Sequence, residues 1–483
     1  MTNLTGPNLN RREAAGPKGE GKESPSTFPA YPEYKDSGVE WLGEVPAHWE
    51  VLPLKARFQV VGGSTPSADE EHWGGQITWV TPADLSSLPS LKVGTSARQI
   101  TQKGLDSCGA TMVPPGSLVL STRAPIGSLA IASVPLSTNQ GCKSLVPDKE
   151  KDSRFFAYLL KNSTEALNVR GKGTTFLELS GDELSSFKVT VPPQDEQSNV
   201  AHFLDHETAR IDALVEEQQR LIELLKEKRQ AVISHAVTKG LDPDVPMKDS
   251  GVEWLGKVPA HWEVFPIKRD LEFLTSGSRG WASHYSDNGA AFIRIGNLTR
   301  DHINLDLTDL QRVSVPKGSE GERTKVKEND VLFSITAYLG SVAVVPEELE
   351  TAYVSQHVAL VRLFKKKLLP SWVAYVTLSD VGKNYLSSQG YGGTKIQLSL
   401  EDVAELLVTA PPLDEQAAII SFLDHETARI DALAEEGDSV ITLLQERRSA
   451  LISAAVTGKI DVRGWTPPAD TAPADRETRM ETV

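Results

Sequence analysis

The stretch KDSGVEWLGEVPAHWEV at residues 35–51 recurs as KDSGVEWLGKVPAHWEV at residues 248–264, with 16 of 17 positions identical. We refer to this stretch as the tryptophan motif. A second stretch, FLDHETARIDAL at residues 203–214, recurs without change at residues 422–433 and is called the helix motif below. Because both motifs repeat in the same order around longer, divergent segments, the chain is a tandem duplication of one unit.

Each copy of the helix motif lies in a long segment with the pattern of an α-helix. The first begins after Pro192–Pro193 and runs from Gln194 to Gly240 without a proline, and the second begins after Pro411–Pro412. Residues recurring every seven positions predict a coiled-coil seam. In the first copy these are Leu204, Ile211, Gln218, Leu225 and Val232, with Leu214 and Leu221 at the interleaved position. In the second copy they are Leu423, Ile430, Gly437, Leu444 and Leu451, with Leu433 and Val440 interleaved. Glycine costs a helix about 1 kcal/mol relative to alanine, so Gly437 predicts a kink.

The divergent segments between the motifs have the pattern of mixed α/β domains. Their Val, Ile and Leu runs are short and are separated by Gly, Pro and Ser, which is typical of short strands. Residues 153–168 and 370–388 have the pattern of helices. The expected fold is therefore mixed α/β (α+β), with two α/β domains related by a pseudo-two-fold axis and separated by two long antiparallel helices that form a coiled coil.

The acidic composition suggests at first that the chain does not bind DNA, but the distribution of the charges does not support this conclusion. The chain has 483 residues, 39% of them apolar, two cysteines and a net charge of −15. Residues 52–190 carry 14 Lys and Arg against 12 Asp and Glu, and residues 265–409 carry 16 against 17. The excess acid lies mostly in the helical segments and tails, so it does not exclude DNA as a ligand. With few cysteines and no apolar run of membrane-spanning length, we expect a soluble cytoplasmic protein and no membrane contact.

The sequence lacks the common catalytic motifs. It has no phosphate loop of the Gly-x-x-x-x-Gly-Lys-Ser/Thr type, no Gly-x-Gly-x-x-Gly after a strand, and no Asn/Asp-Pro-Pro-aromatic segment of an amino-methyltransferase. His202 and His206 are four residues apart and could bind a metal from one helix face. However, the second copy has Ser421 in place of the first histidine. We therefore expect no catalytic residue and no metal site.

Two further features each allow two interpretations. The tryptophan pairs Trp41/Trp49 and Trp254/Trp262 could stack on bases, but core anchors for a short docking segment are favoured because the motif is nearly invariant between the copies. The run Lys365–Lys366–Lys367 could contact phosphate or form a solvated turn, and the sequence does not decide between these two.

The polar residues of the helix motif raise a question of their own. Its leucines and isoleucine are explained by the seam, but packing does not obviously require the polar residues in both copies. Recent duplication is the simplest explanation, although the neighbouring domains have diverged widely. Two identical surfaces on a pseudo-symmetric rod would suit two copies of one partner protein. The candidate partner-binding residues are Asp205, His206, Glu207 and Arg210, with Asp424, His425, Glu426 and Arg429 in the second copy.

Taken together, these features resemble the specificity subunit of type I restriction–modification enzymes. The resemblance is carried by the Trp-Leu-Gly…Val-Pro-x-His-Trp-Glu-Val motif, the Pro-Pro-x-x-Glu-Gln helix start followed by Phe-Leu-Asp, and the two-fold repeat. It covers essentially the whole chain, excluding residues 1–30 and those from about 464 onward. No single motif is decisive, but their order, found twice, is highly specific.

The resemblance implies a DNA reader that is not itself an enzyme. Each divergent segment would be a target recognition domain for one half of a bipartite, asymmetric site in double-stranded DNA. The helices would set the spacing and dock two modification (methyltransferase) subunits, joined by restriction (translocase and nuclease) subunits. S-adenosylmethionine, ATP and Mg²⁺ would be bound by those partners, and this chain would bind no cofactor.

The implied domain limits follow the motifs. We expect a disordered extension at 1–30, the tryptophan motif with the first recognition domain at 31–193, and a central helix at 194–240. The second motif and domain would span 241–412, the C-terminal helix 413–458 and a disordered tail 459–483.

Base readout requires polar side chains that loops carry into the major groove. We expect DNA-contacting residues among polar side chains in loops bounded by Gly, Ser or Pro. In the first domain the candidates are Arg123, Asn139, Gln140, Lys143, Lys172 and Thr174. In the second they are Arg279, Arg294, Asn297, Gln356, His357 and Lys395. The competing hypothesis is a non-catalytic coiled-coil adaptor whose two α/β heads bind proteins or glycans.

Overall fold

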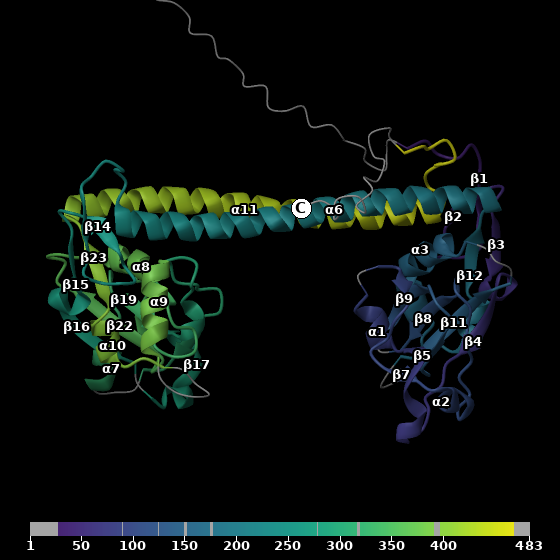
Figure 1. Cartoon of the computed structure of the whole chain (residues 1–483), viewed down its shortest axis with the longest axis horizontal. Coiled ribbons are helices and arrows are strands. Elements are labelled where there is room, and N and C mark those ends of the chain that lie inside the picture. The colour runs from purple at the N-terminus through teal and green to yellow at the C-terminus, as the bar shows by residue number, and fades with distance from the viewer. Residues whose placement is uncertain are drawn as a thin grey trace, which may run out of the picture. The chain divides into compact units, whose positions relative to one another are not determined.

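The computed structural model describes residues 28–467 except 89, 124, 149–151, 174–176, 278, 316–318 and 391–396. The chain forms two compact units (Figure 1). The first consists of Met1–Glu216 and Ile441–Val483, and the second of Glu217–Val440. Each unit therefore contains one tryptophan motif, one divergent domain, the first part of one long helix and the last part of the other.

The first unit begins with the tryptophan motif. Strands β1 (Tyr34–Asp36) and β2 (Glu44–Pro46) form a hairpin, and β3 (Glu50–Pro53) pairs antiparallel with β12 (Lys188–Val191). The motif thus closes the domain by joining its first strand to its last. Among the described residues, five strands form one sheet in the order β4-β11-β8-β9-β6, and three form another in the order β10-β5-β7. Their bounds are β4 Phe58–Gly62, β5 Trp73–Val80, β6 Lys92–Val93, β7 Gln99–Ile100, β8 Leu118–Thr122, β9 Ile126–Ala132, β10 Leu136–Thr138 and β11 Cys142–Pro147.

Short helices cover these sheets. They are η2 Leu54–Ala56, η3 Glu70–His72, α1 Pro82–Ser86, α2 Gln102–Asp106, α3 Arg154–Asn162, α4 Thr164–Val169 and α5 Gly181–Ser186. Helix α3 lies between the sheet and the long helix α6 (Gln194–Lys239), so that Phe155 packs in one core with Leu118 of β8 and Leu204 of α6 (Figure 1). This shared core fixes the domain onto its own part of the helix pair.

The second unit repeats the design. Strands β13 (Met247–Asp249) and β14 (Lys257–Pro259) form the hairpin, and β15 (Glu263–Pro266) pairs with β23 (Leu407–Ala410). The sheets of the described part have the orders β16-β22-β19-β20 and β18-β17-β21, which match those of the first unit except that the described residues include no counterpart of β6. Their strands are β16 Leu271–Ser276, β17 Tyr285–Ile293, β18 Gln311–Val313, β19 Val331–Ser334, β20 Val342–Val344, β21 Ala352–Val354 and β22 Val358–Leu363. The helices are η4 Ile267–Asp270, η5 Trp281–His284, η6 Ile295–Asn297, α7 Ser319–Thr324, α8 Pro370–Leu378, α9 Asp380–Gln389, α10 Leu400–Ala404 and α11 Leu413–Val456.

The sequence predicted one helix at 370–388, but the structure has two helices there, separated at Ser379. This residue is extended (ψ 161°), and its hydroxyl accepts a hydrogen bond from the Gly382 amide, which caps α9. The predicted helix at 153–168 is likewise divided, at Ser163, into α3 and α4. In both places a serine competes with the helix for backbone hydrogen bonds, so the periodic pattern continues while the helix does not.

The predicted antiparallel pairing of the long helices is confirmed within each unit. In the second unit Ile222 of α6 lies against Gly437 of α11, and Arg229 is bonded to Asp431, 2.8 Å away. The partner's number falls as the α6 number rises, which is the antiparallel register. The first unit has the equivalent ion pair of 2.9 Å between Asp212 and Arg448.

One detail of the predicted seam is wrong. Leu214 and Leu221 are 39% and 46% exposed, whereas Ile222 is buried at 7%. The interleaved seam position is therefore one residue later than predicted and includes the polar Arg229. Helix α11 continues through Gly437, and the kink expected there stays a prediction. A Cβ there would lie 3.0 Å from Ile222 Cγ1, so this glycine gives the two helices room to approach closely.

Candidate nucleic-acid interface and partner surface

Several strands of the first unit end at one place. The Ser64 amide donates to Thr138 O (3.0 Å), the Asn139 amide to Val80 O (2.9 Å), and the Thr122 amide to Gly141 O (2.8 Å). These bonds join the ends of β4, β5, β8 and β10 to the start of β11. We call residues 63–65, 122–123, 139–141, 172 and 178 the first loop face.

The first loop face brings together most of the candidates from the first domain. Asn139 Oδ1 accepts a hydrogen bond of 2.9 Å from the Gly141 amide, and Gln140 Oε1 accepts one from the Thr65 hydroxyl. Arg123 and Lys172 flank Glu178 as two backbone bridge partners. Lys172 is 78% exposed and forms an ion pair of 2.7 Å with Glu183. Lys143 lies next to this face, on β11.

A glycine permits the close packing at this face. A Cβ at Gly63 would collide with the backbone oxygens of Asn139 and Thr138. At the same place in the second unit, a Cβ at Gly277 would collide with Val354 O and the Ser355 backbone. Both turns therefore require glycine for steric reasons, although neither glycine has a positive φ.

The second unit has an equivalent loop face, made of residues 277, 279, 335–338 and 355–357. The Ser355 amide donates to Ile293 O (2.9 Å), the Ile335 amide to His357 O (3.0 Å), and the Gly277 amide to Val358 O (3.2 Å). Gln356 and His357 precede β22 as Gln140 and Gly141 precede β11. Gln356 Nε2 lies 3.0 Å from His357 Nε2. Arg279 is exposed beside Gly277.

Two candidates of the second domain have internal roles instead. Asn297 is only 2% exposed; its amide nitrogen donates to Asp306 O (2.8 Å) and Asp309 O (3.1 Å), and its Oδ1 accepts from the Arg294 amide. A side chain enclosed in this way holds its own loop, and the expected contact of Asn297 with DNA stays a prediction. Arg294 Nη2 donates a hydrogen bond of 3.1 Å to Asp309 Oδ2. Thr174 and Lys395 lie outside the described residues.

The structure adds residues that the sequence did not single out. Tyr338 is 60% exposed in a turn between Ala337 (φ 62°) and Gly340 (φ 87°). A non-glycine residue at positive φ is uncommon, and such outliers concentrate at functional sites. In the first unit the Arg98 guanidinium lies 3.5 Å from the centroid of the Trp73 ring. In the sequence, only Gly340 indicated a turn near Tyr338. The spacing of Arg98 and Trp73 did not indicate that they lie together.

The second tryptophan of each pair serves as a core anchor, as favoured from the sequence, whereas Trp254 is 40% exposed and does not. Trp49 and Trp262 are 0% exposed. Trp49 Nε1 donates to Glu196 (2.8 Å) and Trp262 Nε1 to Glu415 (3.0 Å), so each ring is bonded to the first turn of a long helix. Trp41 is stacked on Phe187, with ring centroids 5.4 Å apart.

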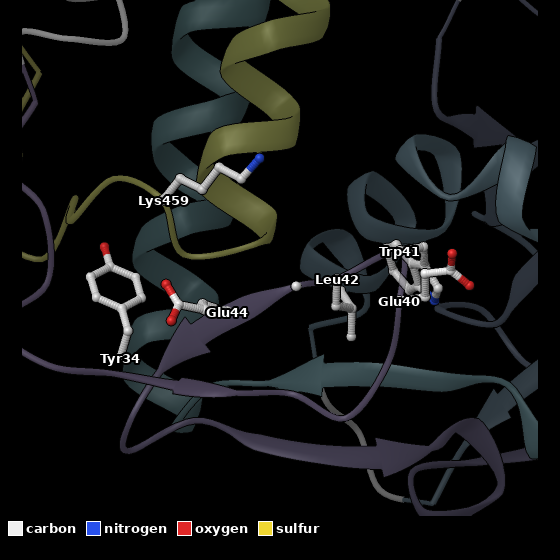
Figure 2. A pocket seen from close by; sticks show the side chains of 7 residues that line it. Tyr34, Glu40, Trp41, Leu42, Glu44 and Lys459 are labelled. Atoms are coloured by element: carbon white, nitrogen blue, oxygen red, sulfur yellow. The ribbon is translucent and has the colours of Figure 1, made fainter.

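A shallow hollow of about 470 Å³ lies where the first hairpin meets the residues that follow α11. Figure 2 shows Tyr34 and Glu44 of the hairpin with Lys459 above them, and to the right Leu42 and Trp41, which belong to the segment between β1 and β2. The Tyr34 hydroxyl donates to Gly458 O at 3.1 Å. The hollow thus lies at the contact between the tryptophan motif and the segment that follows α11.

Cys142 is completely buried at the start of β11, and both cysteines are free thiols. Burial raises the pKa of the Cys142 thiol to about 12. The thiol is therefore neutral at physiological pH and serves as an apolar core group.

The lysine run forms a turn at the end of β22 away from the second loop face. The buried carboxylate of Asp270 accepts hydrogen bonds from the Lys366, Lys367 and Leu368 amides at 2.9–3.2 Å. The side chain of Lys367 is paired with Glu263 at 2.9 Å. These contacts support the turn interpretation over the phosphate interpretation.

Part of the helix motif has an internal use in both units, which the sequence did not reveal. Asp205 accepts a hydrogen bond of 2.8 Å from the Tyr158 hydroxyl, and Asp424 accepts one from Tyr375. Burial is the main reason that the pKa of each tyrosine is raised, so both hydroxyls stay protonated and donate. These two aspartates, predicted to bind a partner, therefore attach each domain to its helix.

The remaining residues of the motif point outward to different degrees. In the second unit His425 and Arg429 have side chains 78% and 66% exposed, with Glu426 between them at 22%. In the first unit His206 and Arg210 are 20% and 46% exposed, and Glu207 is nearly buried at 7%. Near both motifs the helices also expose leucines: Leu214, Leu221, Leu224, Leu433 and Leu443.

Neither a metal-binding cluster nor a membrane-spanning helix is present in the part of the chain that the structure describes. No group of three or more His, Cys, Asp or Glu residues there could hold a metal ion. None of the helices described is both long and apolar enough to cross a bilayer.

Each unit therefore contains one α/β domain with a loop face, and each domain is attached to its own part of the long helices. The family described as "Type I restriction modification DNA specificity domain" matches residues 46–224 and 261–440. The chain therefore belongs to this family. It is a specificity subunit, the non-catalytic DNA-recognition component of a type I restriction–modification system, and the adaptor hypothesis receives no support.

Individual relatives agree. The type I restriction enzyme MjaIX specificity subunit of Methanocaldococcus jannaschii is 29% identical over 381 residues, which are 73% of this chain and 85% of the relative. The EcoBI specificity subunit of Escherichia coli is 23% identical, over 72% of this chain and 74% of its own length.

Solved structures share the fold. The HsdS subunit of Thermoanaerobacter tengcongensis matches with a TM-score of 0.52 at 16% identity, over 86% of this chain and 98% of that one. A chain from a structure on complex assembly and conformational transition of the type I R-M system matches with a TM-score of 0.66 at 15% identity, over 86% and 99%.

Proposed function

We propose that each divergent domain reads one half of a bipartite, asymmetric site in double-stranded DNA through its loop face. The observation that carries this proposal is the equivalence of the two faces. Both are built where β4 or β16 meets the turn before β11 or β22, both need a glycine there, and both place a glutamine at the same turn position, Gln140 and Gln356. Around this shared frame the neighbouring side chains differ, as expected of two readers with different targets.

The chemistry of the faces suits base readout. A glutamine amide pairs bidentately with the N6 and N7 edge of adenine, and arginine pairs with guanine. Arg123 with Asn139 in the first face, and Arg279 with His357 in the second, supply further donors and acceptors. Lys143 and Lys172 would contact phosphates, which set the register without reading the sequence. Because the two domains carry nearly balanced charge, few phosphates are neutralised, and we expect weak DNA binding by the chain alone.

The helix pair would set the distance between the half-sites and hold two modification subunits. The outward residues of the helix motif support this role: His206, Glu207 and Arg210 in the first copy, and His425, Glu426 and Arg429 in the second. The exposed leucines on both helices add the apolar contact that stable docking requires. Asp205 and Asp424 are left out of this surface because they bond to tyrosines of their own domains.

The other partners follow from the same proposal. The modification subunits would carry S-adenosylmethionine and methylate adenine, and restriction subunits would bring ATP, Mg²⁺ and cleavage. All of these cofactors would be held by partners, in the cytoplasm where the DNA lies.

The test is genome-wide adenine methylation in the source cell and in a strain lacking this chain. Loss of methylation at one split motif on deletion, with its return on complementation, is the expected result. An unchanged methylation pattern in cells that express the modification subunit would contradict the proposal.

A further inference from the structure

The two copies of the helix motif have identical sequences but different surroundings. Their inner sides make the same contacts. Thr208 and Thr427 donate to the carbonyls of Leu204 and Leu423 (2.6 and 2.7 Å), and the aspartates at the end of the motif each pair with an arginine of the facing helix. Any difference on the outer side must therefore come from what covers it.

The outer sides do differ. Phe203 is 0% exposed, whereas Phe422, the same residue of the second copy, is 39% exposed. The His206 side chain is 20% exposed, whereas that of His425 is 78% exposed. The exposed Phe422 ring and the exposed His425 imidazole together form a surface on which no other part of the described chain packs as it does on the first copy.

The cover of the first copy comes from the two ends of the described chain. The rings of Phe28 and Trp465 both stand edge-on to Phe203, with centroids 5.2 Å away. Trp465 also lies 5.2 Å from the His206 ring. We call Phe28 and residues 461–465 the aromatic cap. The cap shows what this surface accepts: an aromatic ring placed between the phenylalanine and the histidine.

The cap is anchored at Val462, which is 1% exposed within the core of the first unit. On either side of this anchor it is attached by a small number of contacts. The Asp461 amide donates to Pro29 O (2.7 Å), and Asp461 and Arg463 form an ion pair of 2.6 Å. The Arg463 guanidinium lies 4.9 Å from the Tyr31 ring centroid. Trp465 itself is only partly buried. Trp465, at the end of the cap, can therefore leave Phe203 while Val462 stays in the core, without unfolding of the sheet or the helices.

We propose that the aromatic cap competes with a modification subunit for the first copy of the helix motif, while the second copy is open to it. The occupant is the modification subunit, presenting an aromatic side chain to Phe422 and His425. The contacts on the inner side of the motif do not explain why the outward phenylalanine, histidine and arginine are the same in both copies. A partner that binds to both copies would explain it. This inference rests on the proposed function, in which the modification subunit is the partner present in two copies.

The consequence is stepwise assembly. The first modification subunit binds at the Phe422 surface, and the second binds only after Trp465 has left Phe203. We expect the second step to be about tenfold weaker, a difference of about 1.4 kcal/mol.

The experiment is a titration of the purified full-length chain with its modification subunit, followed by native mass spectrometry and calorimetry. Wild type should show two dissociation constants about tenfold apart. Trp465→Ala should strengthen the weaker step so that the two converge, and Trp465→Phe, the matched control, should keep most of the gap. Phe422→Ala should weaken the tighter step alone. Hydrogen exchange of residues 461–467 should increase only when the second subunit binds.

The alternatives give different results. Two equal constants in wild type, or a gap unchanged by Trp465→Ala, would overturn the cap as a competitor while leaving the proposed function intact. A weaker second step in Trp465→Ala would mean that the cap only stabilises its unit, which also overturns the inference. Self-association of the chain that Phe422→Ala abolishes would assign the surface to a second copy instead. If no modification subunit binds wild type at all, the proposed function itself fails.

Discussion

Trp49 donates a hydrogen bond of 2.8 Å from its indole nitrogen to Glu196, the third residue of α6. The same carboxylate accepts from His48 (2.7 Å) and from the Tyr31 hydroxyl (3.4 Å), and it is nearly buried. Burial, together with the charge of this carboxylate, raises the pKa of Tyr31, so its hydroxyl stays a donor. One glutamate therefore connects the tryptophan motif to the long helix that the motif precedes by some 140 residues of chain.

Removing this carboxylate should loosen the first unit more than the equivalent change loosens the second. Glu196→Ala leaves a buried indole N–H without an acceptor, which costs about 1–3 kcal/mol. Glu415 makes the matching bond in the second unit, but its side chain is 31% exposed, so water can replace it in Glu415→Ala. Hydrogen exchange of β3 and β12, compared with β15 and β23, measures the two effects separately. Equal loosening of both units would refute the expected difference.

The glycine at each loop face should control one half-site. Gly63→Ala forces the turn at residues 138–140 away from β4, because the new Cβ collides with backbone that cannot rotate aside. We expect methylation at one half of the target to lose its sequence specificity while the other half is still read. Gly277→Ala should do the same to the other half.

Matched glycines provide the controls. A Cβ at Gly62, one residue earlier, or at Gly296 in the second domain, meets no atom within 4 Å, and neither has a positive φ. Gly62→Ala and Gly296→Ala should therefore leave recognition intact. Loss of recognition in these controls would show that alanine disturbs the domains generally and that the close approach is not the cause.

The duplication explains why much of this architecture could be predicted from the sequence. Two nearly identical motifs at matching positions fix the repeat, and the prolines before α6 and α11 fix where those helices begin. The seam could not be placed by the same means, because a seven-residue repeat fits Leu214 and Leu221 as well as Val215 and Ile222. The choice depends on what faces each residue, and polar partners such as Asp431, bonded to Arg229, are not visible in the spacing.

The loop residues show the opposite limit. Gln140 and Asn297 are both polar, and both stand near a glycine in a short loop. The structure puts Gln140 on a loop face and encloses Asn297 among backbone carbonyls. A carboxamide satisfies its own loop or a ligand with the same atoms, so only the fold decides between them.

The two glutamines should each contribute to specificity. If Gln140 and Gln356 pair with adenine edges, replacing either by alanine should cost about 1–3 kcal/mol of discrimination at one base pair. Binding of the assembled methyltransferase to target duplexes with single-base changes measures this cost. Gln59→Ala, an exposed glutamine within β4, should have no such effect. Discrimination unchanged in both face variants would remove the glutamines from the readout.

The aromatic cap should be released by acid. Hydrogen bonding and charge from Arg463 hold the pKa of Asp461 below its usual value of 3.8. A carboxyl group with a lowered pKa in the folded state stabilises that state above its unfolded pKa, about 3.9, and this contribution is lost as the pH falls through the lower folded value. We therefore expect the cap to stay docked from neutral pH to about pH 4.5 and to loosen below about pH 4. The fluorescence difference between wild type and Trp465→Phe reports the state of this ring.

Asp461→Asn separates this effect from general acid unfolding. It removes the ionisable group and weakens the bond to Arg463, so the Trp465 signal should already resemble a loosened cap at neutral pH and should not change further as the pH falls below about 4. If the variant instead keeps the wild-type signal and its pH dependence, the Asp461–Arg463 pair does not hold the cap. The aromatic contacts of Trp465 with Phe203 and His206 would then be the main attachment, and a modification subunit would displace the cap by competing for those two rings directly.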